Sequence, residues 1–269
     1  MDYKDKVVVV TGGTRGIGKG CVRIFVEAGA KVVLCSKNQS QSDSLVEELN
    51  ALEKGESFYI KCDVSKPEEI ENLIKQTISR YGQLDCLINN AGWHPPHQPI
   101  DDFSVADFRE LLDLNLVSIF SACKFALPYL RQTKGNIINM SSLVGIIGQH
   151  HAVTYAATKG AIVSLTKALA IDEAPYGVRV NSVSPGNIYT PLWQESVKDA
   201  DNPDQIIKEG EASQLMGRMG TVEEVGKLCL FIASQASFTT GVDHIISGGA
   251  ELDYAVKSRK NKSSFAPNR

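Results

Sequence analysis

The sequence predicts an α/β fold in which one doubly wound parallel sheet carries helices on both faces. Seven short apolar runs recur along the chain, and longer amphipathic patterns separate them. Several runs are β-branched and apolar on both faces, which is typical of parallel strands covered by helices on each side. The expected strands are Lys6–Thr11, Lys31–Cys35, Ser57–Cys62, Leu84–Asn90, Asn136–Met140, Arg179–Ser184 and Asp243–Ser247.

Residues 65–82 carry the clearest of the helical patterns between these strands. Ser65 is a candidate N-cap, Glu68 completes a capping box with it, and Pro67 suits the first turn. Gly82 is expected to end the helix. One apolar stripe at helical spacing supports this assignment, and it consists of Ile70, Leu73, Ile74 and Ile78.

The 269 residues are expected to form one domain, because the chain shows no internal repeat and no low-complexity linker. This domain covers residues 1–254. Residues 185–210 interrupt the alternation of strands and helices, and we expect an irregular lid or binding loop there. Residues 255–269 are polar and basic, and we expect a disordered tail.

Composition excludes several classes of function. A net charge of −3 argues against nucleic-acid binding. No apolar run reaches the length of a membrane span, and the N-terminus enters a strand without the layout of a signal peptide. The six cysteines lack metal-ligand spacing, which favours reduced thiols over disulfides or a metal site. We expect a cytoplasmic protein with no nucleic-acid, membrane or metal partner.

A glycine-rich turn, "TGGTRGIG", follows the first expected strand and precedes an amphipathic segment. Gly12, Gly16 and Gly18 allow a tight turn from strand to helix and let backbone amides approach a pyrophosphate. Glycine is common in plain turns too, but the strand before this one and the helix after it favour a dinucleotide site.

The choice between NAD and NADP depends on the end of the second strand. A carboxylate there would accept hydrogen bonds from a ribose 2′-hydroxyl, but the chain has Ser36, followed by Lys37. Arg15 in the glycine turn adds a second cation, so these residues alone favour NADP unless both cations are simply solvated. Asp63, at the end of the third strand, has two equal interpretations: a bond to the adenine amine or a cap for a loop.

Tyr155 and Lys159 stand one helical turn apart in "YAATKGA", surrounded by small residues. A free phenol, with a pKa of about 10, is a poor base at neutral pH. A nearby ammonium and an oxidised nicotinamide both favour the phenolate, so Tyr155 could take a proton from an alcohol. The alternative is an exposed Tyr–Lys pair on a helix surface.

Three further polar positions strengthen the first interpretation. Ser142 follows the fifth expected strand and could hold a substrate oxygen against the phenol. The segment 89–92, "NNAG", ends the fourth strand beside the expected cleft. Asn115 lies in an otherwise apolar helical segment, where a buried, hydrogen-bonded amide is the common structural role.

These motifs, in this order from Thr11 to about Leu252, resemble the short-chain dehydrogenase/reductase family. The resemblance implies a Rossmann fold and a catalytic tetrad of Asn115, Ser142, Tyr155 and Lys159, with Asn115 placing a water in a proton relay. It also implies the residues that contact the dinucleotide, which are Gly12, Arg15, Gly16, Ile17, Gly18, Ser36, Lys37, Asp63, Val64, Asn90, Ala91, Gly92, Tyr155, Lys159, Ile188 and Thr190.

Longer segments, including "NNAGWHPPHQ" and "GGAELDYA", are similar to a branch of this family that oxidises 17β-hydroxysteroids or L-fucose with NAD. This similarity implies a homotetramer. The substrate residues that it implies are His94, Ser142, Gln149, Tyr155, Trp193 and Tyr254, with Tyr254 reaching in from a neighbouring subunit. His94 could instead be a loop residue with a local hydrogen bond, and Trp193 a lid anchor in the core.

Two positions depart from the pattern. Ser36 replaces the aspartate of the similar branch, and Ser247 replaces the aspartate common before the final glycine pair of the family. Overall similarity favours NAD as the cofactor, and Ser36 leaves NADP open. The expected activity is hydride transfer between NAD(P) and a secondary alcohol or ketone. Two alternatives are an NADPH-dependent 3-oxoacyl-type ketoreductase and a non-catalytic dinucleotide sensor.

Overall fold

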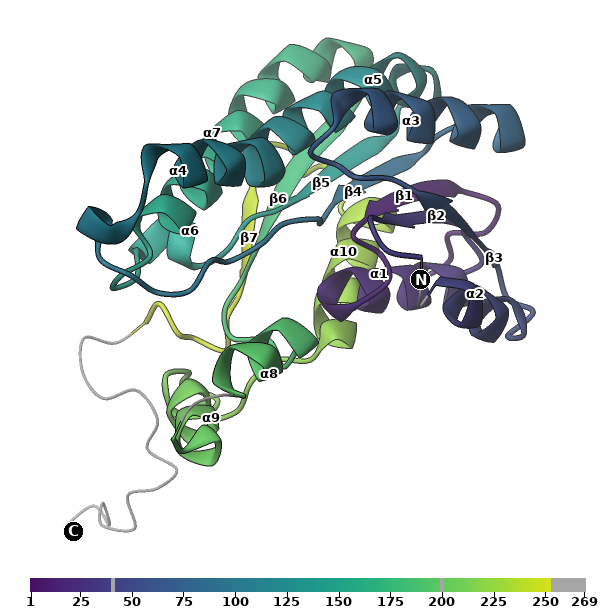
Figure 1. Ribbon diagram of the computed structural model, residues 1–269. Coiled ribbons are helices and arrows are strands. Elements are labelled where there is room, and N and C mark those ends of the chain that lie inside the picture. Colours follow the sequence, from purple (N-terminus) through teal and green to yellow (C-terminus); the bar gives the residue numbers. More distant parts are fainter. Residues whose placement is uncertain (40–41, 199–200, 253–269) are drawn as a thin grey trace, which may run out of the picture.

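Seven parallel strands form a single sheet, as the sequence predicts (Figure 1). The computed structural model describes residues 1–39, 42–198 and 201–252. The sheet order is β3-β2-β1-β4-β5-β6-β7, so the direction of winding reverses between β1 and β4. Such a reversal opens a crevice at the carboxyl ends of the strands. The strands are β1 (Val7–Thr11), β2 (Lys31–Ser36), β3 (Glu56–Lys61), β4 (Cys86–Asn89), β5 (Asn136–Met140), β6 (Arg179–Pro185) and β7 (Asp243–Ile246).

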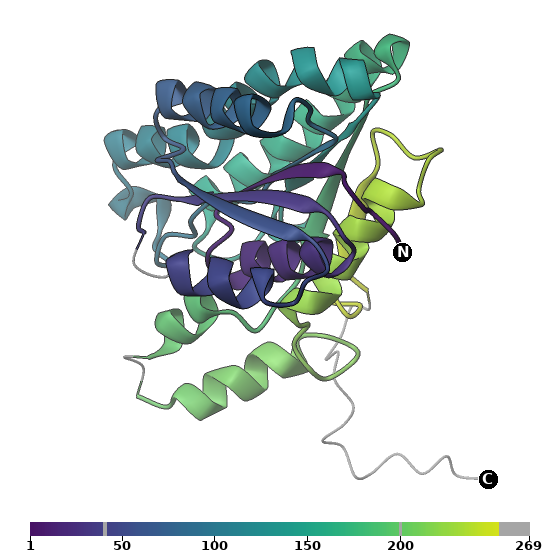
Figure 2. The ribbon, with the colours of Figure 1, turned by 90° about the vertical axis from the view of Figure 1, so that its right-hand side faces the viewer.

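Helices cover both faces of the sheet, which confirms the predicted fold class (Figures 1 and 2). One layer consists of α1 (Gly16–Glu27), α2 (Ser42–Asn50) and α10 (Val222–Ser234). The opposite layer contains α3 (Pro67–Tyr81), α4 (Val105–Leu112), α5 (Ser118–Thr133) and α7 (Val153–Glu173). Shorter elements connect these layers to the sheet, and they are η1 (Ile100–Asp102), η2 (Asp113–Val117), α6 (Val144–Ile147) and η3 (Ala174–Tyr176).

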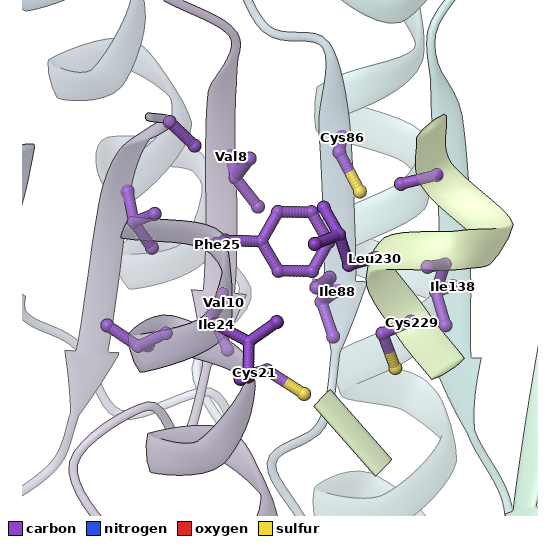
Figure 3. Close-up of a cluster of buried hydrophobic side chains, with 14 of the residues drawn as sticks. Val8, Val10, Cys21, Ile24, Phe25, Cys86, Ile88, Ile138, Cys229 and Leu230 are labelled. Carbon is purple, nitrogen blue, oxygen red and sulfur yellow. The ribbon is translucent and has the colours of Figure 1, made fainter. Parts of the chain in front are cut away.

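Two apolar clusters, one on each face of the sheet, form the core. Phe25 lies fully buried at the centre of the first cluster, between the sheet and α10 (Figure 3). Ile74 of α3 and Ile137 of β5 belong to the second cluster. Every residue of β1, β4 and β5 is buried, as the apolar character of both strand faces predicts.

The N-terminus of α3 corrects one expectation. The helix begins with Pro67 and ends at Gly82 as predicted, but its N-cap is Lys66, and neither Ser65 nor Glu68 forms the predicted capping box. The amide and hydroxyl of Ser65 instead both donate to Asp63 Oδ1, at 3.1 and 2.7 Å. Asp63 therefore binds Ser65 in a local Asx turn, and this turn replaces the helix cap that the sequence predicts at Ser65.

Residues 185–210 are more ordered than predicted, since they contain two helices. These are α8 (Pro191–Val197) and α9 (Pro203–Ala212), which lie apart from the two main layers, below α1 and α10 in Figure 1. Each follows a capping residue, Thr190 or Asn202, whose side chain accepts a hydrogen bond from the first turn. A capping residue followed by proline, as in Thr190–Pro191 and Asn202–Pro203, is a signal for the start of a helix. The prediction of an irregular loop did not use this signal.

The continuous helical stretch Val105–Thr133 is long and apolar enough, by length and composition, to meet the criterion for a membrane span. Half of its most apolar window is buried inside the molecule. Its apolar residues Ile119, Ala126 and Leu130 pack into the core cluster on the face of the sheet that α3, α5 and α7 cover. The stretch therefore has the packing of a core helix. All six cysteines are free and buried, in agreement with the predicted reduced thiols.

Candidate active site

A cleft of about 940 Å³ opens at the carboxyl ends of the strands. The glycine turn, the ends of β2 and β3, the segment after β4 and the start of α8 all contribute to its walls. It brings together most of the residues that the sequence predicts for cofactor and catalysis. Those that line it are Gly12, Arg15, Gly16, Ile17, Ser36, Lys37, Asp63, Val64, Asn90, Ala91, Gly92, Tyr155, Lys159 and Thr190.

The glycine turn is shaped to accept a pyrophosphate. A Cβ atom at Gly18 would lie 2.2 Å from the Gly12 carbonyl oxygen, so only glycine lets the first turn of α1 pack on the loop. Asn90 fixes the same loop, because its Nδ2 donates to the carbonyls of Thr11 (2.9 Å) and Gly12 (3.2 Å). Arg15 provides no side-chain cap for α1, which begins at the wall of the cleft. These features fit a dinucleotide phosphate at the N-terminus of α1.

Both cations near Ser36 have acidic partners. Lys37 Nζ lies 3.0 Å from Asp63 Oδ2, and Arg15 Nη1 lies 3.1 Å from Glu195 Oε1 of α8. Partial burial acts to raise the pKa of Asp63, but bonds from Ser65 and Lys37 hold it below its usual range. Asp63 therefore caps a loop, as one of its two predicted roles requires, and also faces the cleft.

Lys159 is buried, with 4% of its surface exposed, and its Nζ donates to the Met140 carbonyl at 2.9 Å. Its ammonium lies 5.7 Å from the centre of the Tyr155 ring. The pair therefore points into the molecule and is not a surface pair. Close packing on this helix requires a glycine nearby, since a Cβ atom at Gly145 would lie 2.7 Å from the Lys159 carbonyl carbon.

Burial dominates the proton affinities of this pair. It raises the pKa of Tyr155 to about 12, although a hydrogen bond with Ser142 acts in the opposite direction. It also lowers the pKa of Lys159 to about 8. The ammonium alone thus leaves the phenol protonated at neutral pH, and the positive charge of an oxidised nicotinamide would have to supply the rest of the stabilisation.

Asn115 lies in the π-helical turn η2 and is fully buried. Its Oδ1 accepts from the Trp93 amide at 2.9 Å, and its Nδ2 donates to the Trp93 carbonyl at 2.9 Å and to Thr158 Oγ1 at 3.2 Å. Both polar atoms of this buried amide therefore have hydrogen-bond partners within the protein. A π turn inserts one residue and re-aims side chains, and such turns are frequent at functional sites. Asn115 thereby holds the loop that carries Gly92 against α7.

His94 lies over the phenol ring of Tyr155, with 4.1 Å between the two ring centres. Its Nδ1 lies 2.6 Å from the Pro95 carbonyl oxygen, and its Nε2 lies 3.3 Å from Gln149 Oε1. His94 has the local hydrogen bond of a loop residue and also borders the reacting group. Ser142 contributes a hydroxyl to the same place through its bond with Tyr155.

The remaining sequence-predicted residues lie farther from this centre. Ile188 is buried and forms a bridge with Gly220 below the cleft. The Trp193 indole lies against α9, since a Cβ atom at Gly210 would be 2.6 Å from its Cζ2. This position matches the lid-anchor role. Tyr254 lies outside the described residues, as does the tail 255–269.

Several functional contacts were missed by the sequence interpretation. Thr158, three residues after Tyr155, bonds Asn115, and helical spacing alone could have indicated it. The Met140 carbonyl is a backbone group without a sequence signal. Glu195 approaches Arg15 across 180 positions of the chain, which no local pattern reveals.

The cleft over the carboxyl edge of the sheet, together with a serine, a tyrosine and a buried lysine, defines a class of protein: NAD(P)-dependent alcohol dehydrogenases. Comparison with known proteins agrees. A family model described as Enoyl-(Acyl carrier protein) reductase matches residues 12–251. The chain belongs to the short-chain dehydrogenase/reductase family and is an NAD(P)-dependent dehydrogenase that acts on an alcohol group.

Individual relatives are similar over nearly their whole length. The L-fucose dehydrogenase of Bos taurus is 49% identical over 265 residues, covering 98% of this chain and 96% of the relative. That of Oryctolagus cuniculus is 52% identical over 250 residues, covering 93% and 86%. The solved structure of Thermoplasma acidophilum aldohexose dehydrogenase in ligand-free form has a TM-score of 0.84 and 32% identity, covering 93% of this chain and 95% of its own.

The buried charge of Lys159 has a measurable signature in Lys159→Met. The native pKa of about 8 lies below the usual 10.5, so the unfolded state binds more protons in that interval and wild-type stability rises with pH there. The variant lacks this rise. The difference in unfolding free energy, variant minus wild type, is expected to fall by about 2 kcal/mol between pH 7 and pH 10 in urea titrations.

Lys167→Met, on the exposed side of the same helix, is the control and should show a nearly constant difference. A pH-independent difference for Lys159→Met would show that the ammonium is not buried as described.

Proposed function

We propose that the protein oxidises L-fucose with NAD. The supporting observation is the polar pair of His94 and Gln149 beside the phenol of Tyr155, since imidazole and amide groups suit the hydroxyls of a sugar. The names of the similar Bos taurus and Oryctolagus cuniculus proteins support the same substrate. Leu192 adds an apolar patch to the cleft wall, which is the feature that a steroid such as estradiol would use.

In the proposed reaction, each residue has one task. Ser142 donates to the substrate oxygen and holds it beside the phenol. The Tyr155 oxygen takes the hydroxyl proton while the substrate carbon loses its hydride. Lys159 stabilises the phenolate form of Tyr155 that accepts this proton, and the transfer leaves a neutral phenol. When bound, the dinucleotide supplies the hydride acceptor, and residues of the glycine turn and the ends of β2 and β3 would hold it.

NAD is the proposed cofactor in spite of Ser36. The two cations that could attract a 2′-phosphate, Arg15 and Lys37, are each paired with a carboxylate. Their charges are therefore already compensated. Every position of the implied tetrad is filled as well, so we retain no sensor role.

The substrate proposal is tested by initial rates with L-fucose, estradiol and an acetoacetyl thioester, each with the NAD and NADP couples. We expect L-fucose with NAD to give the highest kcat/KM. His94→Phe keeps a ring over Tyr155 but loses both polar contacts, so kcat/KM for L-fucose should fall roughly ten- to hundredfold. His150→Phe, at an exposed position, is the control. Faster turnover of estradiol, or of the thioester with NADPH, would replace the proposed substrate.

The catalytic role of the phenol is tested by Tyr155→Phe. Loss of the proton acceptor should lower kcat by roughly a hundred- to ten-thousandfold while the Kd for NAD stays within about twofold. Tyr176→Phe changes a phenol that lies far along the chain on η3 and should leave kcat unchanged. Equal turnover by wild type and Tyr155→Phe would remove the mechanism.

We further propose a homotetramer in the cytoplasm. Two apolar surfaces support the assembly: Phe120 and Ile171 on the α5–α7 face, and Phe231, Phe238 and Ile245 at the edge formed by α10 and β7. Exposed apolar patches of this kind mark interfaces in symmetric oligomers. The six free cysteines agree with a reducing compartment.

Sedimentation equilibrium measures the assembly. The wild type should give the mass of four chains, and Phe238→Lys, which charges a fully exposed ring, should give a smaller species with unchanged circular dichroism. A monomeric wild type would contradict the tetramer.

A further inference from the structure

The contact between Arg15 and Glu195 joins two parts of the chain that form opposite sides of the cleft entrance. Arg15 is the N-cap residue of α1, in the glycine turn, and Glu195 lies in α8. Arg15 Nη1 is 3.1 Å from one carboxylate oxygen of Glu195 and 3.3 Å from the other. Both side chains are more than half exposed, at 54% and 58%, so either is free to exchange partners with a bound ion.

The backbone holds these two side chains near each other. The side chain of Thr190, the N-cap of α8, lies next to the turn, at ordinary van der Waals distance (3.8 Å) from a Cβ atom built at Gly16. Pro191 lines the cleft, and Glu195 follows it by four positions, on the same side of α8. Glu195 therefore lies beside the cleft wall, where it contacts Arg15 and stays 58% exposed.

The chemical consequence concerns the ribose of the dinucleotide. Arg15, Ser36, Lys37 and Asp63 all line the cleft, and position 36 carries no charge. A ribose 2′-phosphate, with its negative charge, would have Arg15 and Lys37 as its natural partners. Lys37 is already paired with Asp63, and Arg15 is already paired with Glu195.

We propose that Glu195 is a specificity-determining residue that selects NAD by holding Arg15 away from a 2′-phosphate, and so supplies from α8 the carboxylate that position 36 lacks. An NADP molecule must break this pair and then lies close to the freed carboxylate, and both effects weaken its binding. A 2′-hydroxyl carries no charge and incurs neither cost. This inference rests on the proposed NAD preference and names the residue responsible for it.

The test is equilibrium binding to the full chain, without any sugar or steroid. Calorimetric Kd values are measured for NAD, NADP, 5′-AMP and 2′,5′-ADP with wild type and Glu195→Gln. The variant should bind NADP and 2′,5′-ADP roughly three- to tenfold more tightly, the size expected when an exposed ion pair is removed. Its Kd for NAD and 5′-AMP should stay within about twofold.

Two further variants distinguish this mechanism from a general change of charge. The double variant Glu195→Gln, Arg15→Gln should not bind NADP more tightly than the wild type, because the guanidinium of Arg15 is then absent. Glu195→Gln with Ser36→Asp should restore discrimination against NADP, because a carboxylate returns to the ribose site. Glu209→Gln, an exposed position on α9 that bonds Gln205, is the matched control and should change no Kd.

The outcomes separate this inference from the proposed function. An unchanged ratio of Kd values for NADP and NAD in Glu195→Gln overturns the role of Glu195, whatever the substrate proves to be. The same result follows if Glu209→Gln changes the ratio as much. A wild type that binds NADP more tightly than NAD would refute the proposed cofactor. In that case, tighter NADP binding by Glu195→Gln with an unchanged Kd for NAD would still support the role of Glu195.

Discussion

Lys159 carries a positive charge at a point in the molecule that water hardly reaches, and the arrangement of the cleft depends on it. Its ammonium is held by the Met140 carbonyl at the end of β5, and burial lowers its pKa to about 8. A buried ammonium requires close polar partners. The π turn at Asn115 bonds the neighbouring Thr158, and the glycine at position 145 lets α6 pack against the backbone of Lys159.

The same burial keeps the phenol of Tyr155 protonated until an oxidised dinucleotide is bound. In the ligand-free chain the phenol of Tyr155 is a weak acid with a pKa of about 12, because burial outweighs the bond to Ser142. The ammonium of Lys159, 5.7 Å from the ring centre, does not offset this cost. A further positive charge, which the oxidised dinucleotide would supply when bound, is needed before the phenol can act as a base near neutral pH. In the proposed reaction, proton transfer is thus coupled to the oxidation state of the dinucleotide.

Much of this arrangement could be predicted from the sequence, since it depends on local patterns. The seven strands follow from apolar runs, the phosphate turn from glycine spacing, and the Tyr155–Lys159 pair from one turn of helix. The predicted capping box of α3 does not form, because the amide and hydroxyl of Ser65 bond the carboxylate of Asp63 instead. The helices α8 and α9 were missed although Thr190–Pro191 and Asn202–Pro203 are helix starts. Glu195 could not be found, since its partner is distant in sequence and meets it only in the folded chain.

The most direct test of this account is the ionisation of Tyr155 itself, followed by NMR of ring-labelled tyrosine, with the resonance assigned by its absence in Tyr155→Phe. A pH titration of the ligand-free chain should place its pKa near 12, well above that of an exposed phenol. Saturation with oxidised NAD should lower this pKa by at least about two units, as an added buried charge requires. The same pKa with and without NAD would contradict the coupling of proton affinity to the oxidised dinucleotide.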